Sequence, residues 1–155
     1  MTHVRTTSVE ETAALGRAIG ASAIAGTVIA LVGDLGAGKT AFTQGLGAGL
    51  GVQSQVQSPT FIVVQEHEGG RLPLFHADLY RVETEAALQQ VGLDEMIEDD
   101  GVCVIEWADL HPDLLPEDHL LVRISHVAPE DGGGRSLVFV AGGDMHAALL
   151  ERALG

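Results

Sequence analysis

The sequence predicts a three-layer α/β fold in which a mixed sheet has parallel core strands and antiparallel hairpins. Three observations predict this arrangement. A short apolar run rich in β-branched residues, 27–32, leads directly into a glycine-rich turn and a helix-like segment. A nearly continuous apolar run, 101–107, is typical of a strand buried on both faces of a parallel sheet. Two further pairs of strand-like runs flank glycine-rich turns and therefore indicate hairpins.

The other elements follow in order along the chain. Ser8 and Glu11 match a capping box, which predicts a first helix near residues 8–22. Apolar residues at every fourth position predict a second helix after the first glycine-rich turn: Phe42, Leu46 and Leu50. The remaining predicted elements are strands 61–67 and 72–79 around the turn 68–70, a helix at 83–90, strands 119–126 and 135–140, and a final helix at 144–153. No internal repeat or long linker divides the sequence, so residues 1–155 are expected to form a single domain.

Composition limits the possible locations of the protein. Hydrophobic residues make up 46% and charged residues 19% of the sequence, which is typical of a soluble globular protein. Gly, Ser and Thr interrupt the longest apolar stretch, 21–32, and the N-terminus lacks a signal-peptide pattern, so we expect a cytoplasmic protein without membrane association. The lone cysteine, Cys103, lies within an apolar run and is interpreted as a buried core thiol rather than a nucleophile.

The net charge of −14 excludes one class of function. The eight basic residues are spread singly along the chain, so no basic patch is available to neutralise several phosphates of a nucleic acid. Tight, direct binding of RNA or DNA by this chain alone is therefore not expected. The acidic run 94–100 fits either a solvated face or a surface that meets a basic partner.

Residues 33–40 carry the most informative motif. They read Gly-Asp-Leu-Gly-Ala-Gly-Lys-Thr, the full G-x-x-x-x-G-K-[ST] phosphate-binding pattern, and Lys39 is the only lysine in the chain. Such a loop turns backbone N–H groups toward a phosphate, while the lysine reaches the β- and γ-phosphates and the threonine hydroxyl binds Mg²⁺. The motif therefore predicts a fold like that of the P-loop NTPases. The residues expected to contact the nucleotide here are Asp34, Leu35, Gly36, Ala37, Gly38, Lys39, Thr40 and Ala41.

The base of the nucleotide is predicted from what the sequence lacks. P-loop GTPases recognise guanine with an N-K-x-D motif, and this chain has no asparagine and no second lysine from which to build one. ATP is therefore the expected nucleotide.

Two carboxylates are predicted to lie beside the phosphate loop. Ligands of open α/β sheets bind beyond the carboxyl ends of the parallel strands, and Glu106 ends the apolar run that begins near residue 101. There it can hold Mg²⁺ or a water molecule, although a strand-end surface carboxylate has the same pattern. Asp78, which ends the strand predicted at 72–79, is a second candidate, and its alternative role is a helix or turn cap.

Three further features have more than one interpretation. Ser58-Pro59-Thr60 lies where nucleotide switches place a threonine that senses the γ-phosphate, but a turn before a strand looks the same. Trp107 either stacks near the nucleotide or anchors the core. The seven histidines show no metal-ligand spacing, so His76 and the others are interpreted as structural or surface residues.

Four motifs together closely resemble the TsaE family, also called YjeE. They are Gly-Asp-Leu-Gly-Ala-Gly-Lys-Thr at 33–40, Ser-Pro-Thr-Phe at 58–61, His-Ala-Asp-Leu-Tyr-Arg at 76–81 and Ile-Glu-Trp at 105–107, and they occur in family order and spacing. The resemblance implies a small bacterial ATPase that supports formation of threonylcarbamoyladenosine at position 37 of tRNA. It also implies that ATP binding controls docking on the partner proteins TsaB and TsaD, that hydrolysis permits another cycle, and that tRNA is contacted only through those partners.

The resemblance also assigns roles to individual residues. It implies that Lys39 binds phosphate, that Thr40 and Glu106 bind Mg²⁺, and that Asp78 belongs to the active site together with Lys39 and Glu106. It further implies that the segment 58–61, which includes Thr60, forms part of the active or switch region. Arg135 is carried over as a nucleotide contact, and Trp107 is counted as another from the stacking interpretation above.

Two other functions compete with a tRNA-modification ATPase. A small-molecule kinase uses the same loop and Mg²⁺, but such kinases usually cover the phosphates with an arginine-bearing lid, for which only Arg71 and Arg81 lie in suitable positions. A nucleotide-gated binding module with negligible chemistry is the third class.

Overall fold

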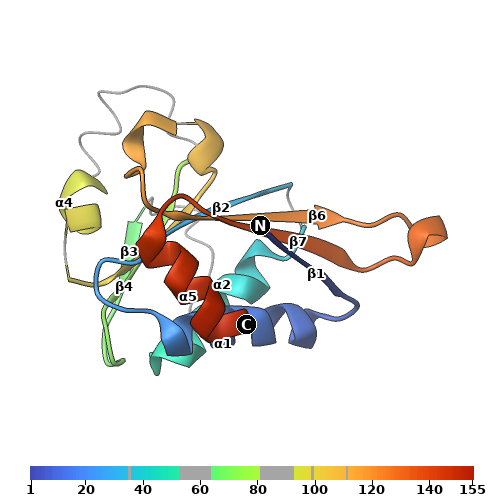
Figure 1. Ribbon diagram of the computed structural model, residues 1–155, viewed down its shortest axis with the longest axis horizontal. Coiled ribbons are helices and arrows are strands. Elements are labelled where there is room, and N and C mark those ends of the chain that lie inside the picture. Colours follow the sequence, from blue (N-terminus) through green and yellow to red (C-terminus); the bar gives the residue numbers. More distant parts are fainter. Residues whose placement is uncertain (35, 53–63, 81–92, 99, 111) are drawn as a thin grey trace.

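The computed structural model describes residues 1–34, 36–52, 64–80, 93–98, 100–110 and 112–155. Its strands form one seven-stranded sheet in the order β1-β7-β6-β2-β5-β4-β3 (Figure 1). The strand β2 is parallel to both of its neighbours, β5 and β6, and β5 is also parallel to β4, whereas β3, β7 and β1 join their neighbours antiparallel. The strands are β1 (Thr2–Thr6), β2 (Val28–Gly33), β3 (Val64–His67), β4 (Leu74–Asp78), β5 (Val102–Glu106), β6 (Leu120–His126) and β7 (Arg135–Ala141).

Helices lie on both sides of this sheet, which gives the predicted three layers (Figure 1). One face packs against α1 (Val9–Ser22), α2 (Lys39–Leu50) and α5 (Asp144–Leu154). The other face is covered by α4 (Leu93–Glu98) and the short 3₁₀ turns Ala108–Leu110 and Pro112–Leu114. A further 3₁₀ turn, Pro129–Asp131, connects β6 to β7. Within the described ranges, none of the helices has the length and apolar character needed to cross a membrane.

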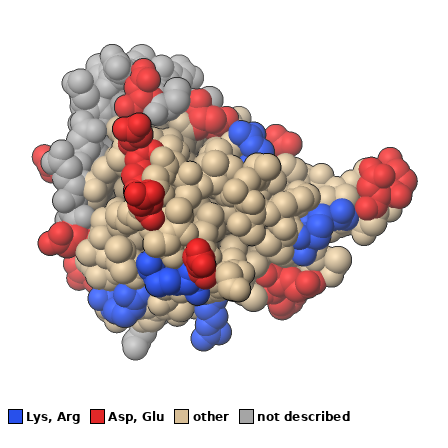
Figure 2. Space-filling model, viewed as in Figure 1, with Lys and Arg blue, Asp and Glu red and all other residues tan. Residues whose placement is uncertain are grey.

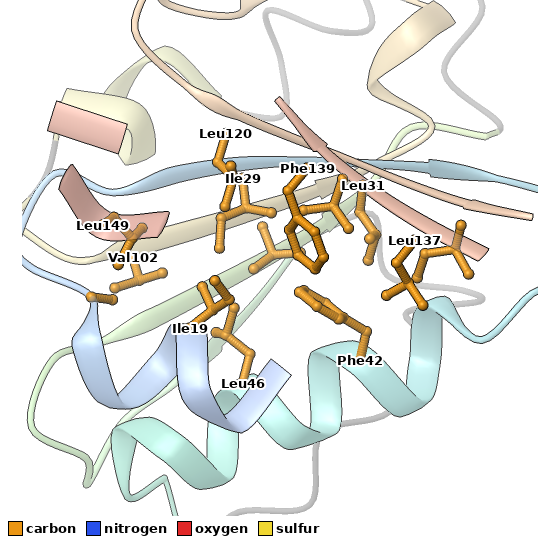
Figure 3. Packing of buried hydrophobic residues seen from close by; sticks show 14 of the residues in the cluster. Ile19, Ile29, Leu31, Phe42, Leu46, Val102, Leu120, Leu137, Phe139 and Leu149 are labelled. Atoms are coloured by element: carbon orange, nitrogen blue, oxygen red, sulfur yellow. The ribbon is translucent and has the colours of Figure 1, made fainter. Parts of the chain in front are cut away.

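The larger of two buried clusters lies between the sheet and the first helical layer. Figure 3 shows Phe42 of α2 facing Phe139 of β7, and their ring centroids are 6.2 Å apart. The smaller cluster lies on the opposite face and includes Cys103, which is 2% exposed. The prediction of a buried core thiol is therefore confirmed, and burial raises the pKa of Cys103 to about 12.

Most described elements match the sequence predictions, and the N-terminal strand β1 is the main exception. Ser8 caps α1 by accepting from the backbone N–H of Glu11, as the capping box predicts. No strand was predicted before this helix, because β1 is an edge strand whose exposed and partly buried residues alternate and whose pairing depends on the distant β7. The predicted helix 83–90 and the strand residues 61–63 lie outside the described residues.

Glycines bring the backbones of α1 and α2 into direct contact. A Cβ atom added at Gly45 would lie 1.9 Å from the carbonyl oxygen of Ala13, and one added at Gly20 would lie 2.2 Å from that of Leu46. Such distances are far below van der Waals contact, so no side chain fits at these positions. The same holds for Gly16, one turn before Gly20 in α1, and for Gly49, one turn after Gly45 in α2. Because α2 begins at Lys39, this contact fixes the helix that carries the phosphate loop.

Side chains from distant elements hold the ends of the helices. Arg71 donates to the carbonyl of Gly20 at 2.8 Å and Arg152 donates to that of Ser22 at 3.0 Å, so two cations offset the negative end of the α1 dipole. Asp118 accepts from the first backbone N–H groups of α5 and from Nδ1 of His146. The Nε2 atom of the same histidine accepts from the N–H of Val28, which ties α5 to the start of β2.

We predict that Gly45→Ala destabilises the protein although alanine is the better helix former. The change gains about 1 kcal/mol of helix propensity, but the added methyl must displace the α1 backbone. Overpacking of this kind costs roughly 1–3 kcal/mol or more, so chemical denaturation should show a net loss. Ala48→Gly on the exposed side of α2 is the control, with a loss of about 1 kcal/mol from propensity alone. A Gly45→Ala protein as stable as the parent would contradict the close packing of α1 and α2.

Candidate active site

The phosphate loop connects the end of β2 to the start of α2. Gly36 and Gly38 have positive φ angles of 76° and 111°, a region that other residues rarely occupy. Gly38 is also the N-cap of α2 and provides no side chain to accept from the first N–H groups of the helix. The positive end of a twelve-residue helix is therefore left open for an anion, which is the arrangement expected of a phosphate site.

The Lys39 ammonium lies at the centre of this site. Its Nζ atom donates to the carbonyl oxygen of Gly33 at 2.6 Å and lies 3.8 Å from the centroid of the Trp107 ring. Burial lowers the pKa of Lys39, and the negative charges of Glu106 and Asp78 partly oppose that shift. A bound phosphate would favour the charged form further, because it places negative charge beside the ammonium.

Asp78 and Glu106 end the neighbouring strands β4 and β5, where they are directly paired in register. Burial raises the pKa of Asp78, and the nearby Glu106 adds to that shift, while the backbone N–H of Tyr80 donates to Asp78 Oδ1 at 2.9 Å and opposes it. Asp78 therefore caps a turn, which was one of its two predicted roles, and it also lines the cleft, while its catalytic role stays a prediction. Glu106 is only 2% exposed, so the alternative of a strand-end surface carboxylate is wrong.

His76 makes a contact near this site that the sequence interpretation did not predict. It is completely buried in β4, and its Nε2 atom lies 2.5 Å from Oε2 of Glu106. The interpretation of His76 as a structural or surface residue therefore missed a direct contact with a candidate metal ligand. The available signal was its spacing, because His76 and Asp78 are two residues apart and side chains of a strand alternate between faces.

The site residues line a cleft of about 230 Å³ that is formed by Gly36, Gly38, Lys39, Thr40, Asp78, Glu106 and Trp107. Among the described residues, no group of three or more His, Cys, Asp or Glu side chains could hold a metal ion. Magnesium, however, is usually held by one or two protein oxygens together with substrate phosphates and water. The Thr40 hydroxyl and the Glu106 carboxylate in one cleft fit that requirement.

A second cavity of about 230 Å³ lies against the phosphate loop. It shares Gly36 and Gly38 with the cleft, and its other walls are Thr7, Ser8, Val9, Thr12, Ala41, Gly134 and Arg135. Arg135 donates to the carbonyl oxygen of Gly36 at 3.3 Å, which places it next to the loop, and its contact with a nucleotide stays a prediction. This cavity brings together the start of α1, the start of α2 and the start of β7, which are far apart in the sequence.

The remaining predicted site residues differ in where they lie. Asp34 is exposed on the loop, whereas the side chain of Ala37 is buried in the core and its N–H donates to the carbonyl of Asp34 at 3.1 Å. Leu35 and the segment 58–61, which contains Thr60, lie outside the described residues.

Comparison with known proteins identifies the family. Residues 6–136 match the family model of the threonylcarbamoyl adenosine biosynthesis protein TsaE. The chain is 42% identical to TsaE of Bacillus subtilis over 147 residues, which cover 95% of this chain and 90% of that protein. It is 41% identical to TsaE of Nostoc sp. over 115 residues, covering 72% and 71% of the two chains.

A solved structure shows the same fold. The crystal structure of Bacillus subtilis YdiB superposes with a TM-score of 0.85 at 38% identity, covering 98% of this chain and 93% of that one. The family-model match over residues 6–136 includes the phosphate loop and both carboxylate-bearing strands, and the solved structure has the same fold over nearly the whole chain. This chain therefore belongs to the TsaE family of threonylcarbamoyladenosine biosynthesis proteins.

Proposed function

We propose that this protein is a cytoplasmic, Mg²⁺-dependent P-loop ATPase that supports threonylcarbamoyladenosine formation in tRNA by nucleotide-controlled binding to the TsaB–TsaD complex. The observation that carries the ATPase proposal is the single cleft shared by Lys39, Thr40, Asp78 and Glu106 at the open end of α2. Family membership supports the role in tRNA modification. We infer the partner complex from the resemblance to TsaE.

Each cleft residue has a part in this chemistry. The N–H groups at the start of α2 and the Lys39 ammonium would bind the phosphates, and Thr40 with Glu106 would hold the cation. Bound Mg²⁺ supplies neutralisation of the charge that develops on the phosphate oxygens. Asp78 lies beside Glu106 and its pKa is raised by burial, so this carboxyl group is suited to orient water or accept its proton.

The second cavity offers space for the remainder of the nucleotide. It adjoins the phosphate loop through Gly36 and Gly38, and its walls combine the apolar side chain of Val9 with the hydroxyls of Thr7 and Ser8. Such a mixture suits a base and a ribose, because ligand pockets pair apolar walls with a few polar groups. Arg135 is the cationic residue of this cavity.

The alternative of a small-molecule kinase is not favoured by the described arginines. Arg71, one of the two arginines in suitable sequence positions, is bound to the C-terminal carbonyls of α1 and not to the phosphate loop. Arg81 lies outside the described residues. A nucleotide-gated module without turnover would use the same cleft, and a measurement of ATP turnover separates it from an ATPase.

We predict that Glu106→Ala lowers ATP turnover by at least about 100-fold, which is the typical effect of removing one group that stabilises a transition state electrostatically. Nucleotide binding and nucleotide-dependent association with TsaB–TsaD should persist, because Lys39 and the loop remain. Phosphate release and co-elution measure the two properties. Glu130→Ala, at an exposed carboxylate in the β6–β7 connection, is the matched control. A parent protein that binds Mg·ATP without turnover, even with its partners, would instead support the binding module.

We also predict that the isolated protein has negligible affinity for tRNA at physiological salt. Its net charge is −14, and Figure 2 shows acidic side chains spread over the visible face with basic ones in small groups. Several arginines are already engaged by backbone carbonyls: Arg5, Arg71, Arg135 and Arg152. Fluorescence anisotropy with labelled tRNA should show binding only when TsaB–TsaD is present. Micromolar or tighter binding by the chain alone would contradict this division of labour.

A further inference from the structure

His76 and Glu106 contact each other through side chains that are both buried. The side chain of His76 is 0% exposed and that of Glu106 is 3% exposed, and their 2.5 Å contact is one of the shortest polar contacts in the described part of the chain. The two residues lie on adjacent parallel strands, with Ala77 and Asp78 paired in register with Ile105 and Glu106. The strand pairing therefore sets the distance between the imidazole and the carboxylate.

The surroundings of His76 indicate which ring nitrogen carries its proton. Nδ1 is buried and finds no hydrogen-bond partner among the residues that the structure describes, whereas Nε2 faces the Glu106 oxygen. A neutral imidazole has a single N–H, and only an N–H directed at a carboxylate forms a charge-assisted hydrogen bond. The proton therefore belongs on Nε2, where it holds Oε2 of Glu106.

The hydrogen bond from His76 occupies Oε2 of Glu106 and leaves Oε1 available. Among the described residues, no side chain or backbone group donates to Oε1 of Glu106, although the residue lines the cleft beside Thr40. One oxygen is thus anchored to the sheet and the other remains for a ligand in the cleft. A carboxylate fixed in this way is ready to bind a cation without first losing rotamer freedom.

The anchor also matters because Lys39 is close by. The Glu106 and Asp78 charges both act on the Lys39 ammonium, yet Lys39 forms no ion pair with any described carboxylate. It donates to Gly33 and lies over Trp107 instead. A Glu106 side chain free to rotate would be drawn toward the ammonium and away from the cation position, so the loss would fall on metal binding.

We propose that His76 is a positioning residue that holds Glu106 in the orientation needed to bind the divalent cation. The proposal rests on the proposed function, because it assigns Glu106 to the cation that accompanies the nucleotide. His76 itself touches neither the nucleotide nor the cation. A substitution of His76 is therefore expected to weaken Mg²⁺ binding and turnover, and to leave ATP binding without a divalent cation unchanged.

The test compares His76→Leu, which removes the N–H donor, with His76→Gln, which retains an amide donor on a side chain of similar reach. Binding of ATP is measured by calorimetry without divalent cation and across a Mg²⁺ titration, and turnover is measured in parallel. For His76→Leu we expect near-parental affinity for metal-free ATP, and a loss of about 10- to 100-fold in Mg²⁺ affinity or activity, the usual effect of removing a hydrogen bond to a metal ligand. His76→Gln should recover most of that loss.

A double-mutant cycle distinguishes positioning from general packing. In a Glu106→Gln background the charged ligand is already gone, so adding His76→Leu should cost little further Mg²⁺ affinity. An equal loss in both backgrounds, a parallel loss of metal-free ATP binding, or parental Mg²⁺ dependence in His76→Leu would each overturn the proposal. If the parent protein itself binds no Mg·ATP, the proposed function fails. If the parent binds Mg·ATP and His76→Leu has the same Mg²⁺ dependence as the parent, the proposed function stands and the proposed role of His76 fails.

Discussion

The backbone contact between α1 and α2 is the constraint on which the site depends. These two helices approach so closely that no side chain fits between them at the contact. Glycines of each helix therefore face the backbone of the other. The first residue of α2 is Lys39, and Thr12 of α1 lies next to Gly38. The packing that fixes α2 therefore also fixes the phosphate loop, and α1 becomes a wall of the adjoining cavity. Fold and site share one set of contacts here.

The order of the strands provides the second half of the site. Because β4, β5 and β2 are adjacent and parallel, their carboxyl ends meet at one edge of the sheet. Asp78 pairs with Glu106, and Leu31 of β2 pairs with Glu106 from the other side, so the carboxylates lie next to the loop that follows β2. All residues of β5 are buried, so Glu106 is held at the end of a strand that is packed on both faces.

The sequence was sufficient where a residue's role is local and insufficient where it depends on a distant partner. The loop at 33–40 and the run ending at Glu106 were predicted because each carries its own pattern, which the structure reproduces in β2, α2 and β5. The strand β1 was missed because its partner β7 lies more than a hundred residues away. The contact of His76 with Glu106 and the facing glycines of α1 and α2 were missed for the same reason, since spacing alone does not identify the partner.

Trp107 connects these parts of the site. It follows Glu106 directly and has a φ angle of 59°, which is a costly conformation for a bulky residue and persists only when the surroundings impose it. Its backbone N–H donates to the carbonyl of Leu31, and its ring packs against Tyr80 at 4.8 Å between centroids and covers Lys39. The turn that places the indole over the ammonium thus begins at the residue that His76 anchors. The cation ligand proposed at Glu106 and the ring that covers Lys39 are therefore placed by consecutive residues at one strand end.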